Sequence, residues 1–375
     1  MASNCRKLGG YIREIDRRNT ENRQDNLLGL SVTKRFIPSI ANTVGTDFRK
    51  YKIVEKGQFA YIPDTSRRGD KIAIALLEDW DSGLVSNVYT VFEVVGEGLL
   101  PKYLELWFRR PEFDRYARFK SHGSVREIFD WGQLRDVELP VPSIAEQQRI
   151  VDSFNAIERR IDSLQQLNDK LAAMVSMIRT QLAAVGTPVL LCERTEMQYG
   201  YTQTATCEPV GPKFLRITDI SSGQLDWDEV PYCSIDDKQY MRYQLEPGDT
   251  VVARTGISAG VARFFGGSIP KAVFASFLVR VRANNPIEQT YTGLTISSSD
   301  FFEYIQANAG GSAQPQANPP LLGQYEYPLP GESELRVFNR RIAPIINAIE
   351  TNEQEITLLK RLQKSLLSNL SKADV

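Results

Sequence analysis

The 375-residue sequence contains few residues that bind metals or form disulfides, with only four cysteines and one histidine. The cysteines (Cys5, Cys192, Cys207 and Cys233) form no Cys-x-x-Cys pair, and His122 has no histidine partner. A structural zinc site takes about four such ligands at short spacing. We therefore expect free thiols, no metal site, and no hydrolase or nuclease chemistry that depends on histidine.

Long apolar runs and a net charge are also missing. No run of about 18 apolar residues occurs, so no membrane-spanning helix is expected. The N-terminus lacks the apolar segment of a secretory signal, which favours a cytoplasmic protein with no membrane partner. The 45 basic and 46 acidic residues nearly cancel, giving a net charge of −1. This balance does not exclude nucleic acid, because binding depends on local clusters of basic residues.

Signatures of nucleotide and cofactor binding are absent from the sequence too. No Gly-x-x-x-x-Gly-Lys-Ser/Thr segment occurs, which argues against ATP hydrolysis by this chain. Asn318-Pro-Pro-Leu resembles the motif with which adenine-N6 methyltransferases hold their target amine. Leu321 replaces the aromatic residue that would stack on the flipped base. We therefore expect no catalytic residues and no cofactor bound by this chain.

Two long segments carry a heptad pattern of apolar residues. Steps of four and three residues from Ile150 meet an apolar residue at nearly every position to Val185, and the same pattern returns 188 residues later. This pattern predicts two coiled-coil helices that pair along matching seams. The predicted seam consists of Phe154, Ile157, Ile161, Leu164, Asn168, Leu171 and Ile178 in the first helix and Ile342, Ile345, Ile349, Ile356, Leu359 and Leu366 in the second.

One seam position is polar, and it leaves two interpretations open. Asn168 occupies a core position whose counterpart in the second helix is Ile356. A buried asparagine at such a position fixes the register of paired helices at a cost in stability. Alternatively, Asn168 faces a gap or solvent where the helices cross.

The helices divide the chain into four predicted segments. These are a domain at 1–143, a helix at 144–186, a second domain at 187–331 and a second helix at 332–375. Ser143 and Glu146 form a predicted capping box at the start of the first helix. The domains are rich in Val, Ile, Tyr and Phe, as strands are, and they repeat several motifs in the same order. The sequence therefore predicts an α+β fold with two duplicated strand-rich domains separated by two long antiparallel helices.

Five segments give the chain a resemblance to a known family. In chain order they are Pro140-Val-Pro-Ser-Ile-Ala-Glu-Gln-Gln-Arg-Ile-Val, Tyr199-Gly-Tyr-Thr, Lys213-Phe-Leu-Arg-Ile-Thr-Asp-Ile, Pro247-Gly-Asp-Thr-Val-Val-Ala-Arg-Thr-Gly and Gly311-Ser-Ala-Gln-Pro. Together with the order domain–helix–domain–helix, they resemble the specificity (S) subunit of type I restriction-modification systems, the HsdS family. The second repeat has Gly331-Glu-Ser-Glu-Leu-Arg where the first has Ser143-Ile-Ala-Glu-Gln-Gln, so its Glu-Gln pair is incomplete.

The resemblance implies the partners and the division of labour. Each domain would be a target-recognition domain that reads one half of a split double-stranded DNA site, and the antiparallel helices would set the gap. Two methyltransferase (HsdM) subunits would bind this chain, and restriction-translocase (HsdR) subunits would join them. S-adenosylmethionine, ATP and Mg²⁺ would belong to those partners. Outward positions of the helices, such as Arg159, Arg160, Gln165, Gln166, Asp169 and Lys170, are plausible docking sites.

The candidate DNA contacts are polar and basic residues on loops, because such side chains read base edges and phosphates. In the first domain they are Lys34, Arg35, Ser66, Arg67, Arg68, Lys71, Ser124 and Arg126. In the second domain they are Arg254, Thr255, Ser258, Lys271, Gln314 and Gln316. For any single residue, a solvated loop charge is the competing interpretation.

Other functions remain as alternatives at this stage. A methyltransferase or nuclease fused to its own reading domain would need a cofactor signature. An assembly scaffold would use the helices without reading DNA, which the basic loops oppose. A specificity subunit of a type IIB system, whose single partner both methylates and cleaves, is not distinguished from a type I subunit by the sequence.

Overall fold

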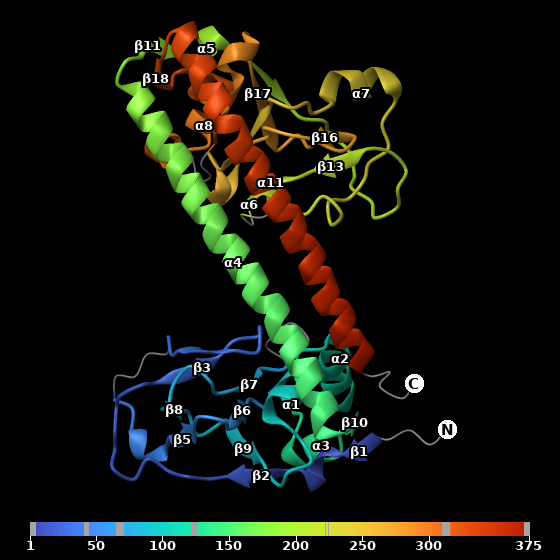
Figure 1. Cartoon of the computed structure of the whole chain (residues 1–375). Helices are drawn as coiled ribbons and strands as arrows, with labels where there is room; N and C mark the ends of the chain where they lie inside the picture. The colour runs from blue at the N-terminus through green and yellow to red at the C-terminus, as the bar shows by residue number, and fades with distance from the viewer. Residues whose placement is uncertain are drawn as a thin grey trace. The chain divides into compact units, whose positions relative to one another are not determined.

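The computed structural model of the chain describes residues 5–40, 45–64, 71–121, 127–221, 223, 225–309 and 316–370. Its contacts divide into two compact units. Unit 1 comprises Met1–Arg160 and Leu359–Val375, and unit 2 comprises Ile161–Leu358. The long helices α4 (Ile144–Ala183) and α11 (Glu332–Asn369) each contribute residues to both units (Figure 1).

Unit 1 is built on a four-stranded antiparallel sheet with the order β2-β9-β6-β7. Its strands are β2 (Ile12–Ile15), β9 (Thr90–Val94), β6 (Phe59–Tyr61) and β7 (Ile74–Leu76). Smaller antiparallel pairs join β1 (Cys5–Lys7) to β10 (Glu138–Pro140), β3 (Leu28–Leu30) to β4 (Phe36–Pro38), and β5 (Lys52–Glu55) to β8 (Ser82–Val85). The strands β2 and β9 lie far apart in sequence, so the sheet depends on long-range pairing.

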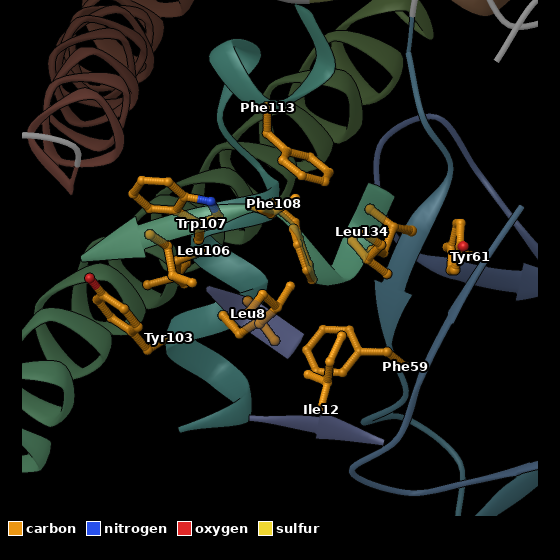
Figure 2. Packing of buried hydrophobic residues seen from close by; sticks show 14 of the residues in the cluster. Leu8, Ile12, Phe59, Tyr61, Tyr103, Leu106, Trp107, Phe108, Phe113 and Leu134 are labelled. Carbon is orange, nitrogen blue, oxygen red and sulfur yellow. The ribbon is translucent and has the colours of Figure 1, made fainter. Parts of the chain in front are cut away.

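Helices cover this sheet and supply an aromatic core. They are α1 (Pro101–Phe108), α2 (Pro111–Lys120) and α3 (Trp131–Arg135), with short 3-10 turns η1 (Leu8–Gly10) and η2 (Phe48–Lys50). The rings of Phe59 and Phe92 stack with centroids 4.9 Å apart, and Phe108 from α1 meets Phe59 edge-on at 5.8 Å. Figure 2 shows Phe59, Phe108 and Leu134 converging from the sheet, α1 and α3.

Unit 2 repeats this plan with a sheet ordered β12-β17-β14-β15. Its strands are β12 (Thr195–Tyr199), β17 (Leu278–Ala283), β14 (Thr250–Ala253) and β15 (Ala262–Phe264). The pair β11 (Thr187–Leu190) and β18 (Glu326–Leu329) is antiparallel, and β13 (Lys213–Leu215) and β16 (Ala272–Phe274) are parallel. The helical elements are α5 (Leu191–Arg194), α6 (Ile217–Ser221), α7 (Asp237–Tyr243), η3 (Gly256–Ser258), η4 (Pro286–Glu288), α8 (Gln289–Ile296), α9 (Ser299–Asn308) and α10 (Pro319–Gly323).

The start of α4 follows from its sequence. Ser143 precedes the helix, and its hydroxyl accepts a hydrogen bond from the backbone N–H of Glu146 at 3.3 Å. Such a cap satisfies one of the donors that the first helical turn leaves free. At the other end, α4 stops at Ala183, and the N–H groups of Val185 and Gly186 donate to the carbonyls of Leu182 and Ala183 in a turn before β11.

The apolar seam residues of both long helices point inward. All the predicted seam residues are buried or half-buried. In unit 1, Phe154 of α4 and Leu370 at the end of α11 join the core of the unit. In unit 2, Val175 of α4 and Ile342 of α11 join one cluster with the sheet. The two helices thus pack against each other, as in the predicted α+β architecture, and each also belongs to the core of a strand-rich domain.

The segment from Pro101 to Lys120 forms two helices, α1 and α2, with a break between them. Arg110 is extended, with φ −68° and ψ 135°, and Pro111 opens α2. A proline disfavours helical backbone in the residue before it, so the chain breaks there and restarts.

Candidate nucleic-acid interface

Each unit has an edge where two loops meet, and the two edges occupy equivalent places. In unit 1, Asp64 after β6 forms an antiparallel bridge with Ile128. In unit 2, Thr255 after β14 forms an antiparallel bridge with Gln316. Thr255 lies 191 residues after Asp64, and Gln316 lies 188 residues after Ile128, so the two bridges join equivalent positions of the repeat. We call the surface around the first bridge edge 1 and that around the second edge 2.

At edge 2, Arg254 is held in a defined position. Its guanidinium carbon lies 4.9 Å from the ring centroid of Tyr199. Its backbone N–H donates to the carbonyl of Phe277 at 2.9 Å, and its own carbonyl accepts from the N–H of Ala317 at 2.8 Å. The cation is oriented by stacking on this ring, and the residue as a whole is half-buried.

Other predicted contacts of unit 2 lie on the same edge or near it. Thr255 and Ser258 are half-buried, and Gln316 is exposed beside Thr255 through the bridge. Lys271 is exposed, with its ammonium 4.6 Å from the ring centroid of Tyr240 on α7. The structure therefore brings Arg254, Thr255 and Gln316 together, whereas Lys271 lies on a separate loop.

In unit 1 the two neighbours Lys34 and Arg35 have different environments. Lys34 is 5% exposed, and its ammonium lies 2.6 Å from Oδ1 of Asp114. Burial lowers the pKa of Lys34, while the carboxylate of Asp114 acts in the opposite direction. Arg35 is 67% exposed, with only a 3.8 Å ion pair to Glu158. Lys34 thus stabilises the fold of unit 1, and we leave it out of the proposed interface, whereas Arg35 stays a candidate.

Several predicted contacts lie outside the described residues. These are Ser66, Arg67, Arg68, Ser124, Arg126 and Gln314, together with His122. Lys71, which follows the first of these segments, is exposed. Asp64 and Ile128, which form the edge 1 bridge, lie at or near the ends of the described ranges 45–64 and 127–221.

The methyltransferase-like motif has a structural role. Asn318 caps α10, and its side-chain oxygen accepts from the N–H of Leu321 at 3.0 Å. Asp130, at the same place in unit 1, caps α3 by accepting from the N–H of Gln133 at 2.8 Å. Both side chains therefore serve as helix caps. Within the described ranges, no group of three or more His, Cys, Asp or Glu residues lies close enough to hold a metal ion.

One residue of the resemblance motif has a role that the sequence did not reveal. Gln147 is fully buried in unit 1, and its amide bonds three backbone groups. The amide oxygen accepts from the N–H of Leu100 at 2.8 Å, and the nitrogen donates to the carbonyls of Gly98 at 3.0 Å and Pro142 at 2.8 Å. In unit 2 the equivalent residue is the buried Leu335. The incomplete Glu-Gln pair of the second repeat is therefore a difference in core packing.

The structure also shows the surroundings of Asn168, the polar residue of the seam. The side-chain nitrogen of Asn352 donates to the side-chain oxygen of Asn168 at 2.7 Å, and the nitrogen of Asn168 reaches the carbonyl of Ile349 at 3.5 Å. Asn168 is half-buried and bonded to the partner helix, so it does not face an empty gap.

Comparison with known proteins agrees with this architecture. No family model matches the sequence. The specificity subunit of the type I restriction enzyme MjaVIII from Methanocaldococcus jannaschii is 21% identical over 285 residues. The match covers 68% of this chain and 66% of the relative, a little under two thirds of its length. In the part of the chain that the structure describes, no helix is long and apolar enough to cross a membrane.

Solved structures extend the similarity to nearly the whole chain. The S subunit of the type I restriction-modification system of M. genitalium aligns over 99% of both chains with a TM-score of 0.60 and 12% identity. The HsdS subunit of Thermoanaerobacter tengcongensis aligns over 99% of this chain and 97% of that one, with a TM-score of 0.41 and 18% identity. The fold assignment rests on the first of these.

The fold defines a class of two-domain α+β proteins in which a pair of long helices joins two copies of one strand-rich plan. The chain has the fold of a type I S subunit and is similar in sequence to a type I specificity subunit. In sequence and in fold the chain therefore resembles the HsdS family, as the motifs predicted.

Proposed function

We propose that this chain is the DNA sequence-specificity subunit of a type I restriction-modification complex. Each unit reads one half of an asymmetric, bipartite site in double-stranded DNA. The observation that carries the proposal is the pair of equivalent edges with different residues. The same bridge occurs in both units, but it is followed by Ser66-Arg-Arg in one and by Ile257-Ser-Ala in the other. One scaffold that presents two different surfaces suits the reading of two different half-sites.

The residues at edge 2 have the chemistry that base reading needs. Arginine donates bidentate hydrogen bonds to guanine, and glutamine does the same to adenine. Arg254 and Gln316 provide these groups, while Thr255 and Ser258 provide hydroxyls. In unit 1, the corresponding groups are Arg35 and Lys71, together with the sequence candidates Ser66, Arg67, Arg68, Ser124 and Arg126, which lie outside the described residues. Phosphate contacts by Lys71 and Lys271 would position the duplex and make binding depend on salt.

The helix pair supplies the ruler between the half-sites. An uninterrupted α-helix of 40 residues, the length of α4, extends about 60 Å. The Asn168–Asn352 hydrogen bond fixes the register of the two helices, because any sliding by a heptad would leave both amides without this partner. A fixed register means a fixed gap between the half-sites.

The outward side of α4 supplies a docking surface for the methyltransferase subunits. Leu167, Met174 and Met177 are exposed, and their spacing of seven and three residues puts them on one side of the helix. Charged neighbours such as Asp169 and Lys170 frame this stripe. Methionine adapts its shape to a partner surface. Two HsdM subunits dock in this way, and HsdR subunits join the assembly through them.

Catalysis and its cofactors belong to the partners. The chain recognises DNA without catalytic residues, and S-adenosylmethionine, ATP and Mg²⁺ are bound by the methyltransferase and restriction subunits. A type IIB arrangement would differ in having one partner polypeptide that both methylates and cleaves, which purification of the complex would reveal.

Single-molecule sequencing of adenine methylation in host DNA tests the proposal. The genome is sequenced with and without this gene, keeping the methyltransferase gene in both strains. We expect a split motif with a fixed gap that disappears when this gene is deleted. Methylation that persists unchanged after the deletion would contradict the proposal and favour an assembly scaffold.

A further inference from the structure

The loop of edge 2 carries an isoleucine that contacts almost nothing in the protein. Ile257 lies in η3 and is 97% exposed. Single exposed apolar residues are common on protein surfaces and need no explanation by themselves. Ile257 differs in its surroundings, because it lies between predicted DNA-contacting residues, Thr255 and Ser258, at the edge that we propose to face DNA.

The loop around Ile257 is braced, so the side chain is presented in a fixed way. Gly256 and Gly260 adopt φ values of +73° and +89°, which glycine tolerates. The carbonyl of Ala259 accepts a hydrogen bond from the side chain of Gln306 at 2.7 Å, and the N–H of Gly260 donates to the carbonyl of Ala253 at 2.9 Å. An isoleucine on a braced loop loses little freedom on binding, because a β-branched side chain has few rotamers.

Apolar and aromatic groups accompany Ile257 on this part of unit 2. Phe277 is 57% exposed, and its carbonyl accepts from the N–H of Arg254. Tyr199 is 43% exposed and stacks with Arg254. Edge 2 thus combines an isoleucine and two aromatic rings with one cation and several hydrogen-bonding groups. At the equivalent place, edge 1 has Ser66 in the sequence.

We propose that Ile257 reads the C5-methyl group of a thymine in the major groove of the half-site bound by unit 2. This inference rests on the proposed function. The methyl group of thymine is the apolar feature of the major groove, and apolar side chains recognise it by contact. A duplex is favoured over a protein partner here, because the neighbouring Arg254 and Gln316 supply the donors and acceptors that match base edges. Unit 2 therefore requires a thymine in its half-site.

Replacing thymine by deoxyuridine tests this contact, since it removes the methyl group and leaves base pairing intact. The chain is purified with co-expressed methyltransferase subunits, and its affinity is measured by fluorescence anisotropy. The probes are duplexes that contain the motif identified by methylation sequencing. In each probe, one thymine of the motif is replaced by deoxyuridine. For the wild-type complex we expect one position to weaken binding by about fourfold, as for one buried methyl group.

Variants assign the effect to Ile257. Ile257→Ala should weaken binding to the duplex without deoxyuridine by at least about fourfold. The variant should no longer lose affinity when deoxyuridine replaces the one sensitive thymine. Ile257→Leu, which keeps the hydrocarbon volume, should retain part of the sensitivity. Val210→Ala is the control, since Val210 is 54% exposed in the same unit and lies outside the proposed interface. It should behave as wild type.

The possible results separate the two proposals. If Ile257→Ala keeps full sensitivity to every deoxyuridine, or if no position is sensitive in the wild type, the methyl-reading role is wrong although the complex still selects its motif. If Ile257→Ala lost affinity equally for all duplexes, with and without deoxyuridine, the methyl-reading role would also be overturned. Ile257 would then make a contact without base specificity. If the wild-type complex binds its motif no better than a scrambled duplex, the proposed function itself fails.

Discussion

Units 1 and 2 share their scaffold to the level of single hydrogen bonds, yet they differ where side chains face outward. The hydroxyl of Tyr103 donates to the carbonyl of Pro140 at 3.1 Å in unit 1. Its counterpart Tyr291, 188 residues later, donates to the carbonyl of Pro328 at 2.9 Å. Gly57 and Gly248 both adopt positive φ values, +87° and +96°. These residues satisfy or bend the backbone, so the fold restricts what can replace them.

The outward residues at equivalent positions follow no such restriction. Helix α2 of unit 1 carries Arg115, Phe119 and Lys120, where α9 of unit 2 has Glu303, Ala307 and Asn308. Phe119 is 79% exposed. The comparison teaches that the buried Tyr103 and Tyr291 repeat their bond to the backbone, whereas these exposed positions diverge. Divergent surfaces on one scaffold are what two different half-sites require.

The largest effect is expected from shortening the two long helices, to which both units contribute residues. Deleting one heptad from both long helices, residues 163–169 and 351–357, removes about 10 Å of helix, or about three base pairs of DNA. We expect methylation at the original gap to fall to background and to appear at shorter gaps with both half-sites unchanged. More than one shorter gap is expected, because the deletions also remove the Asn168–Asn352 pair. Methylome sequencing reads this result. Altered half-site sequences would contradict the ruler, and deleting the heptad from only one helix is the control that should abolish assembly.

The next effect concerns a buried ion pair in unit 1. Lys34→Ala leaves the carboxylate of Asp114, which is 13% exposed, without its cation. Breaking a buried pair in this way costs about 3–5 kcal/mol, so the amides of unit 1 should exchange faster with solvent. Hydrogen-exchange mass spectrometry measures this change unit by unit. Arg35→Ala is the matched control, expected to change stability by less than about 0.5 kcal/mol. Equal exchange in both variants would show that the pair does not support unit 1.

A smaller effect tests whether Gln147 and Leu335 are interchangeable. Gln147→Leu removes three hydrogen bonds and leaves backbone groups of unit 1 unpaired, at a cost of about 2 kcal/mol. Leu335→Gln buries an amide with no partner in place of an apolar side chain, at a similar cost. Thermal unfolding of each variant, followed by hydrogen exchange, should show a loss confined to the altered unit. A tolerated exchange would mean that the two cores are more alike than the structure indicates.

The smallest effect is expected at the seam asparagines. Asn168→Leu alone deprives Asn352 of its 2.7 Å hydrogen bond and should destabilise the helix pair by about 1 kcal/mol. Replacing both with leucine should restore or raise stability, because two matched apolar residues need no partner. The gain should come with methylation at more than one gap length. A double variant that keeps a single gap would show that the register is fixed elsewhere in the seam.

Local patterns in the sequence predicted part of this molecule. The heptad pattern predicted where the long helices lie and that residues such as Leu164 and Ile342 point inward. A period of 3.5 residues puts such positions on one face of a paired helix. Ser143 marked the start of α4 through its capping chemistry. The order of repeated motifs predicted the duplicated plan, and the family resemblance added the expected partners.

Features that depend on distant residues were out of reach. Lys34 looked like a loop cation, but its burial depends on Asp114, eighty residues away on α2. Gln147 belonged to a motif whose role was unknown until its bonds to Gly98 and Leu100 were visible. Ile257 gave no signal at all, since one isoleucine between Gly256 and Ser258 has no periodicity. The position of edge 2 required the bridge from Thr255 to Gln316.

The most direct test of the account is the methylation motif of two variants, each altered at one edge. Arg254→Ala removes the cation of edge 2 and should relax the sequence requirement of one half-site. The expected loss in discrimination between bases is about 1–3 kcal/mol. Arg67→Ala with Arg68→Ala removes the basic pair of unit 1. The account predicts that each variant relaxes a different half of the motif and leaves the other half and the gap unchanged. If either variant altered both halves, or if both variants altered the same half, the two units would not be independent readers.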